Sequence, residues 1–145
     1  MIDDQLSRKI LIAAGLMGAA SVAIGAFGAH GLPGFLVVRG VDSETIARRV
    51  TQFDTGARYH LVHAVALFAL ATVPYGSPAG RRITAALFIG GIVFFSGSLY
   101  VLVLTNQTWL GRVTPIGGLL WILAWLTLIL IAQKRRMPFW SQPKS

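Results

Sequence analysis

Long apolar segments constrain this sequence more than any other feature. Four can be drawn, at residues 10–29, 59–73, 83–104 and 113–132. About 20 apolar residues cross the roughly 30 Å hydrocarbon core of a bilayer as a helix. Residues 59–73 reach that length only if Arg58 and Tyr59 lie at the membrane interface. The sequence therefore predicts an all-α integral membrane protein, a four-helix bundle forming a single domain over residues 1–145.

Composition agrees with a lipid environment. Hydrophobic residues make up 54% of the 145 residues and charged residues only 12%. A soluble fold of this size could not bury so much apolar surface. The first segment could also be a signal peptide, because Arg8 and Lys9 precede it and residues 26–28 would suit cleavage. Its length favours an uncleaved first span.

The net charge of +8 lies at the ends of the apolar segments and forms no patch, so nucleic acid is not an expected partner. An even number of spans puts both termini on one side. On that side lie Arg8, Lys9, Arg81, Arg82, Lys134, Arg135, Arg136 and Lys144; opposite them lie Arg39, Arg48, Arg49, Arg58 and Arg112. This bias predicts cytoplasmic termini and a multi-pass protein of a bacterial inner membrane, or matrix termini if the membrane is mitochondrial.

The long connection between the first two spans predicts a short amphipathic helix at residues 43–57. Ser43 suits its N-cap, and Ile46, Val50, Phe53 and Ala57 form one apolar face. Arg48 and Arg49 lie on the other face, as in a helix lying flat among head groups, where Arg58 is also expected. Equally open is a loop helix packed on the bundle.

Small residues predict close packing of the spans. They recur every fourth residue in the first span, and glycines interrupt the third and fourth. Backbones approach closely along such positions. The residues expected at helix contacts are Gly18, Ser21, Gly25, Gly90, Gly97, Gly117 and Gly118.

Polar residues at membrane depth are costly, so each is a functional hypothesis. Most of them fall in the outer half of the predicted bundle. They form a candidate binding cluster of His30, Tyr59, His60, His63, Ser96, Tyr100 and Thr114. The cluster has two main interpretations: side chains that bond only to neighbouring helices, or a site for a quinone, a lipid or a similar amphiphile.

Catalytic and metal-dependent functions lack their usual groups. The predicted spans contain no Asp or Glu, and the chain has no cysteine, which excludes disulfides and thiol catalysis. Three histidines without a nearby acid make a poor zinc site, and haem ligation by His30 and His63 is an equally weak alternative. We therefore expect no catalytic residue, no metal and no cofactor.

Four motifs resemble one known family. They are residues 25–32 (GAFGAHGL), 55–64 (TGARYHLVHA), 95–100 (FSGSLY) and 114–118 (TPIGG). In this order they resemble the family that contains YgdD and transmembrane protein 256, a domain of unknown function (423), over nearly the whole chain. Residues 33–45 depart from it and look longer than usual. The resemblance implies a four-span protein of bacterial or mitochondrial inner membranes and implies no activity.

The sequence thus predicts a membrane protein of unknown function, with a non-enzymatic structural or accessory role. Its partners would be the lipid bilayer and either further copies of itself or a larger membrane complex. The alternative is a binding protein or carrier for a quinone, lipid or similar amphiphile. An oligomeric pore or small-solute transporter is a weaker reading, because one protomer is small and no inverted repeat is evident.

Overall fold

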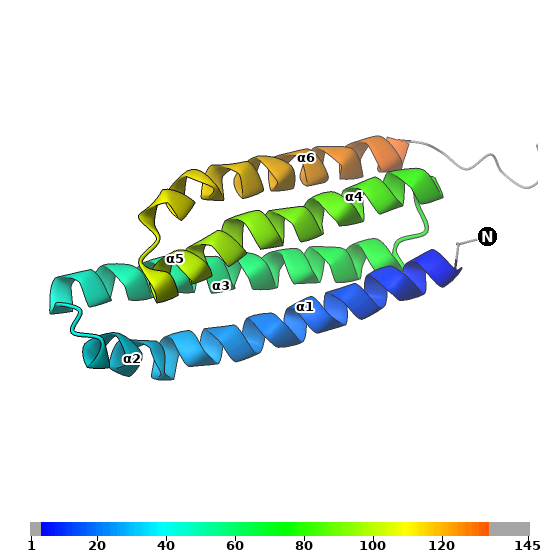
Figure 1. Cartoon of the computed structure of the whole chain (residues 1–145). Helices are drawn as coiled ribbons and strands as arrows, with labels where there is room; N and C mark the ends of the chain where they lie inside the picture. The colour runs from blue at the N-terminus through cyan, green and yellow to red at the C-terminus, as the bar shows by residue number, and fades with distance from the viewer. Residues whose placement is uncertain (1–3, 134–145) are drawn as a thin grey trace, which may run out of the picture.

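A computed structural model describes residues 4–133, and these residues form helices joined by short turns (Figure 1). The predicted basic residues Lys134, Arg135, Arg136 and Lys144 lie outside the described residues. In chain order the elements are α1 (Asp4–His30), α2 (Leu32–Val38), α3 (Ser43–Thr72), α4 (Pro78–Gly91), a π-helical turn η1 (Ile92–Gly97), α5 (Ser98–Thr105), a 3-10 turn η2 (Thr108–Arg112) and α6 (Thr114–Gln133).

Three helical stretches of the described chain are long and apolar enough to cross a membrane. They are Gln5–His30, Pro78–Thr105 and Thr108–Gln133, with 26, 28 and 26 residues. At a rise of 1.5 Å per residue, even the shorter ones extend about 39 Å, more than the hydrocarbon core. They contain the predicted spans at residues 10–29, 83–104 and 113–132.

The remaining two predicted helices are one helix, which corrects the sequence interpretation. Residues 43–57 and 59–73 were expected as separate elements, whereas α3 runs without a break from Ser43 to Thr72. The only residue near the expected break that disfavours a helix is Gly56, and one glycine costs a helix only about 1 kcal/mol relative to alanine. Arg58, His60 and His63 reduce the mean hydropathy of this stretch, and α3 is not among the three apolar spans.

The segment before α3 is also more helical than expected. Residues 32–38 form α2, which has a proline in its first turn, where no amide donor is needed. Helix α3 begins at residue 43 as expected, but its N-cap is Asp42 and not Ser43: the Asp42 Oδ1 accepts the Thr45 amide at 2.9 Å. That bond favours the ionised carboxylate and lowers the pKa of Asp42.

The apolar face predicted for residues 43–57 lies against protein. Phe53 is buried with Leu32, Leu36 and Val103 in a cluster at the α2 end of the molecule. Ile46 and Val50 pack on the same cluster. Of the two alternatives for this segment, the structure therefore has the helix packed on its neighbours.

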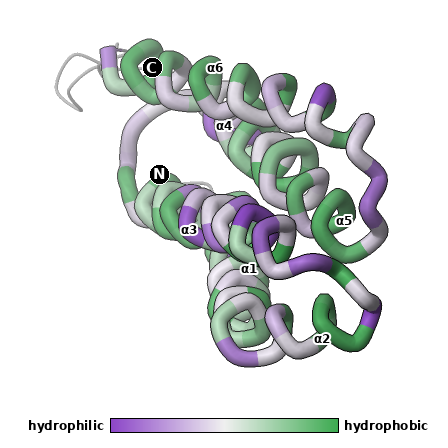
Figure 2. The backbone as a smooth tube through the Cα atoms, turned by 90° about the vertical axis from the view of Figure 1, so that its left-hand side faces the viewer, coloured by the Kyte–Doolittle hydropathy of each residue, from purple (hydrophilic) through white to green (hydrophobic). Residues whose placement is uncertain are grey.

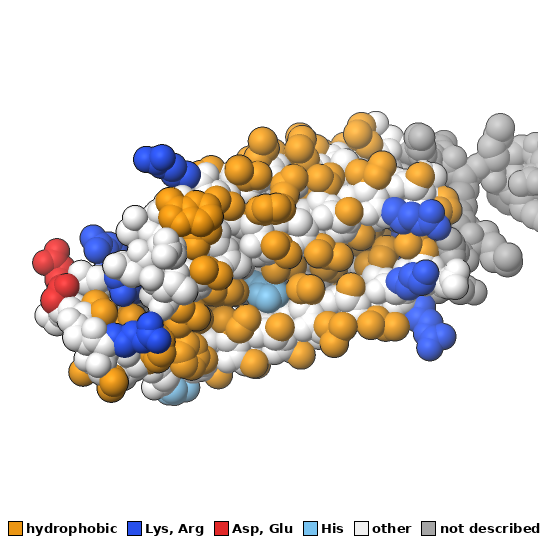
Figure 3. Space-filling view, in the orientation of Figure 1, with side chains coloured by type: hydrophobic (Ala, Val, Ile, Leu, Met, Phe, Trp, Pro, Cys, Tyr) orange, Lys and Arg blue, Asp and Glu red, His pale blue; other side chains and the backbone are white. Residues whose placement is uncertain are grey.

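The long elements pack in the order α1, α3, α4 and α6 (Figures 1 and 2). Helix α1 lies along α3, which in turn contacts α4, η1 and α5. Helix α6 packs on α4 and η1. Figure 3 shows one face of the molecule, where apolar side chains cover the middle and basic side chains lie towards the two ends.

Two glycines permit the closest approach between α6 and the α4–η1 stretch. A Cβ atom at Gly117 would overlap the backbone of Phe95, and one at Gly91 would overlap the indole of Trp121. Gly117 was an expected contact position. Among the remaining expected positions, Ser21 is buried, and a Cβ atom at Gly90 would lie 3.2 Å from Leu120 Cδ1. The other glycines have ordinary or open surroundings, namely Gly18, Gly25, Gly97 and Gly118.

Arg81 joins three helices at the end of the molecule where α1 begins. It lies in the first turn of α4 and is 3% exposed, although the sequence places it outside the predicted spans. Its Nη2 donates to the carbonyls of Leu70 and Ala71 at 2.9 and 3.2 Å and to the hydroxyl of Ser7 at 3.1 Å. The cation therefore caps the C-terminal end of α3, where carbonyls lack helical partners.

Candidate functional site

The predicted polar cluster divides into separate groups in the structure. Tyr59 and His63 face α6, while His60, Ser96 and Tyr100 lie between α3 and the η1–α5 stretch. Thr114 bonds to Ser98, with 2.8 Å between the two hydroxyl oxygens. His30 is exposed at the end of α1 and makes no hydrogen bond or ring contact with the described residues.

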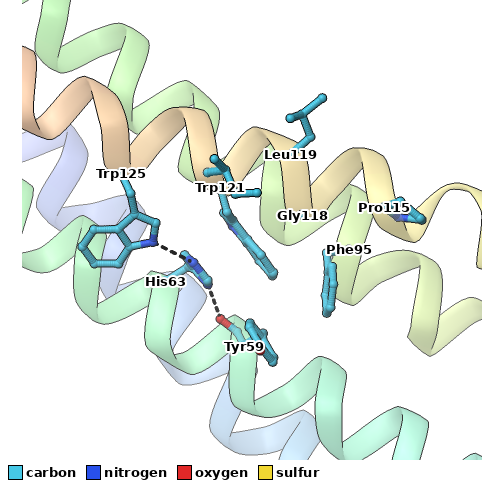
Figure 4. A pocket seen from close by; sticks show the side chains of 9 residues that line it. Tyr59, His63, Phe95, Pro115, Gly118, Leu119, Trp121 and Trp125 are labelled. Carbon is cyan, nitrogen blue, oxygen red and sulfur yellow. Dashed lines mark hydrogen bonds between the residues drawn. The ribbon is translucent and has the colours of Figure 1, made fainter.

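His63 is the centre of the largest aromatic group. Its imidazole stacks on the indole of Trp121 with 3.7 Å between ring centroids and 2° between planes (Figure 4). Both side chains are 4% exposed, and Trp121 Nε1 donates to the carbonyl of Phe88 at 3.2 Å. The stack fills the space between α3 and α6, and it fixes both rings.

Hydrogen bonds also assign the tautomer of His63. Nδ1 lies 2.7 Å from the carbonyl oxygen of Tyr59, which can only accept, so Nδ1 carries the hydrogen. Nε2 lies 3.3 Å from Nε1 of Trp125, and an indole N–H can only donate. The ring is therefore a neutral imidazole whose two nitrogens are both bonded inside the protein.

Beside this stack, a groove of about 480 Å³ runs between α3 and α6, and we call it the aromatic groove. Its lining residues come from α3, η1 and α6 and include five aromatic side chains, counting His63. They are Tyr59, His63, Phe95, Pro115, Gly118, Leu119, Trp121, Ile122 and Trp125 (Figure 4). None of these residues carries a formal charge when His63 is neutral.

The rings of Tyr59, Phe95 and Trp121 in the groove form one nearly parallel pair and two tilted pairs. The Tyr59 ring is nearly parallel to Trp121, at 13° with centroids 5.7 Å apart. Phe95 is tilted at about 41° to Tyr59 and 42° to Trp121, with centroids 5.2 and 4.7 Å away. Tyr59 is 49% exposed, and its hydroxyl has no hydrogen-bond partner among the described residues. The groove thus offers ring faces and one hydroxyl.

His60 belongs to a second and tighter group. Its Nδ1 lies 3.3 Å from the hydroxyl of Tyr100, and its Nε2 is buried without a partner among the described residues. Ser96 donates to the carbonyl of Gly56 at 2.8 Å, and a Cβ at Gly56 would lie 2.9 Å from the Tyr100 ring. These contacts bind η1 and α5 to α3 in closely filled space.

The arginines that the sequence predicts at the membrane interface lie at the end of the molecule that contains α2. Arg58 pairs with Asp54 at 2.7 Å, and Arg49 bonds to the side-chain oxygen of Asn106. Arg48 is exposed. The described residues contain no group of three or more His, Cys, Asp or Glu side chains that could hold a metal ion.

Comparison with known proteins places this arrangement in a family. The model of a family described as "Protein of unknown function (DUF423)" matches residues 24–118. The chain belongs to this family. Residues 24–118 contain the α3 and η1 walls of the aromatic groove, whereas Trp121 and Trp125 lie beyond the matched range.

Individual DUF423 relatives are named as membrane proteins. The UPF0382 membrane protein YwdK of Bacillus subtilis is 36% identical over 129 residues, covering 87% of this chain and 98% of its own length. The UPF0382 inner membrane protein YgdD of Escherichia coli is 35% identical over 130 residues, covering 85% and 88%. A UPF0382 membrane protein of Haemophilus influenzae is 33% identical over 123 residues, covering 85% and 92%. No solved structure matches the chain.

Trp121 and Trp125 are among the groove residues that sequence reasoning missed as a site in this DUF423 protein. A signal was present: the two residues are four apart and share a helical face, as His60 and His63 do at a spacing of three. Pairing those two faces would have predicted an aromatic contact between α3 and α6.

Proposed function

We propose that this DUF423 protein crosses an inner membrane four times as a helical bundle, with α3 as the fourth span and both termini in the cytoplasm. Burial on α3 supports the fourth crossing. His60 and His63 face inwards, whereas Leu61, Val62, Val65 and Phe68 are exposed. An apolar outer face with polar residues inside suits a lipid-facing helix, although the histidines reduce its mean hydropathy.

The proposed role is that of a non-enzymatic structural or accessory protein, alone as an oligomer or beside a larger complex. One observation carries this proposal: both ring nitrogens of His63 are hydrogen-bonded within the chain. Other polar side chains behave in the same way, since Thr84 bonds to Thr127 at 2.8 Å and Ser96 to the Gly56 carbonyl. Such hydrogen bonds stabilise the contacts between helices.

Native mass spectrometry of protein released gently from its own membrane tests this role. We expect the wild type to travel with another polypeptide or as a defined oligomer. Tyr100→Phe serves as the matched control, because it removes one hydroxyl and should leave the same protein complex. A wild-type chain that is always released as a lone monomer would contradict the accessory role.

Binding of an amphiphile is the second candidate function, and the aromatic groove favours it. Pockets of about 300–1,000 Å³ with mostly apolar walls and a few polar groups are typical small-molecule sites. The groove has that size and lining. A small mass retained by the purified wild type, and absent from a groove variant, would support this function.

A further inference from the structure

The aromatic groove has features that select among amphiphiles. We infer that it binds the flat, uncharged ring of a tailed amphiphile, of which an isoprenoid quinone is the chemical type. The inference rests on the second candidate function and goes further by naming the part of the ligand that is recognised. It is independent of the accessory role.

The walls favour a ring over a plain hydrocarbon chain. Tyr59 and Trp125, 49% and 46% exposed, and Phe95 come from three different elements and line the groove with aromatic side chains. A planar ligand ring gains stacking and edge contacts with such walls beyond the burial of its area. A saturated chain gains only the area term.

The polar groups of the groove favour a neutral ligand. No formally charged side chain lines it, and both nitrogens of His63 already have partners. The Tyr59 hydroxyl has no partner among the described residues and can donate to a ring carbonyl. A ligand with a charged head group would lose its hydration in the groove and gain no counter-charge.

The direction of the groove provides space for a tail. Tyr59 follows Arg58, whose exposed ion pair with Asp54 suits the head-group level. On α6 the lining runs from Pro115 to Trp125, about 15 Å along the helix axis. A ring beside Tyr59 can therefore direct its tail along α6 towards the middle of the bilayer.

Gly118 allows the groove to be filled without disturbing the fold. A Cβ at Gly118 would lie 3.8 Å from Phe95, an ordinary contact, so a leucine side chain there extends into the groove. Gly18→Leu is the matched control, because Gly18 lines a different groove, of about 380 Å³, between α1 and α3. Its walls are mainly aliphatic, and a Cβ there meets nothing within 4 Å.

The test is saturable binding of decylubiquinone to the purified full chain in lipid nanodiscs, followed by quenching of tryptophan fluorescence. We expect saturation for the wild type and for Gly18→Leu, and at least about tenfold weaker binding for Gly118→Leu. Tyr59→Phe should weaken binding about three- to tenfold, the usual effect of one lost hydrogen bond. Circular dichroism and size-exclusion profiles equal to wild type establish that each variant is folded.

Two results would overturn the inference. One is equal binding by Gly118→Leu and the wild type; the other is competition by a saturated C16 alcohol as effective as competition by decylubiquinone. The second result would leave an amphiphile site in place and remove only its preference for rings. Loss of ring binding with the protein complex still present in native mass spectrometry would separate this inference from the accessory role.

Discussion

The imidazole of His63 lies parallel to the indole of Trp121, with 3.7 Å between the ring centroids. This contact joins α3 to α6, although the backbone of α6 packs on α4 and η1. The two imidazole nitrogens also bond to Tyr59 and Trp125, so the His63 side chain contacts one residue of α3 and two of α6. We therefore regard His63 as the residue that sets the distance between α3 and α6.

Replacing His63 with alanine should destabilise the protein strongly. The change removes a buried ring, its stack and two hydrogen bonds, which together contribute about 3 kcal/mol to the free energy of unfolding. Unfolding by sodium dodecyl sulfate in mixed micelles measures the effect. His30→Ala is the control, because its exposed side chain should contribute less than about 0.5 kcal/mol. Equal stability of the two variants would refute the structural role of His63.

Adjacent glycines on α6 should respond in opposite ways to the same change. A methyl group at Gly117 would overlap the Phe95 backbone, so Gly117→Ala should separate α6 from η1 and lower the free energy of unfolding by about 2–3 kcal/mol. Gly118→Ala meets only an ordinary contact and should be neutral or slightly stabilising. The same micelle unfolding assay compares the pair, and a larger loss for Gly118→Ala would contradict the observed packing.

Arg81 and Arg82 are adjacent in the sequence, and the same substitution should affect stability differently at the two positions. Arg81→Met removes two hydrogen bonds that cap α3 and one to Ser7 of α1, and should cost about 2–3 kcal/mol of stability, since bonds from a charged donor are strong. Arg82 is exposed, and Arg82→Met should have almost no effect. Thermal unfolding in detergent distinguishes the two. If both variants unfold at the wild-type temperature, the cap makes no contribution to stability.

The fourth crossing can be tested by labelling, because the chain has no cysteine and gives no background. Single cysteines at the exposed positions Arg48 and Ala79 lie beyond opposite ends of the proposed α3 span. A membrane-impermeant maleimide added to intact spheroplasts should label Arg48→Cys and leave Ala79→Cys unlabelled until the membrane is broken. Labelling of both positions from the outside would mean that α3 does not cross the membrane.

Apolar segments and turn residues were enough to predict three membrane-length helices, because length and composition are local properties. The continuity of α3 was missed because His60, His63 and Arg58 give its sequence the polarity of an interface, whereas in the fold both histidines are buried and Arg58 pairs with Asp54. Spacing put His60 and His63 on one face. Spacing alone could not show that the tryptophans of α6 would pack against His63 and not against His60.

The order of packing has a consequence for how the chain enters its membrane. Helices α1 and α3 form one hairpin, and α4–α5 with α6 form a second, joined through contacts of α3 with η1 and α5. In the four-span arrangement, α3 exposes His63 to hydrocarbon until Trp121 and Trp125 arrive with the last helix. Insertion of α3 is therefore expected to depend on synthesis of α6, so that a chain truncated before residue 114 would leave this segment outside the bilayer.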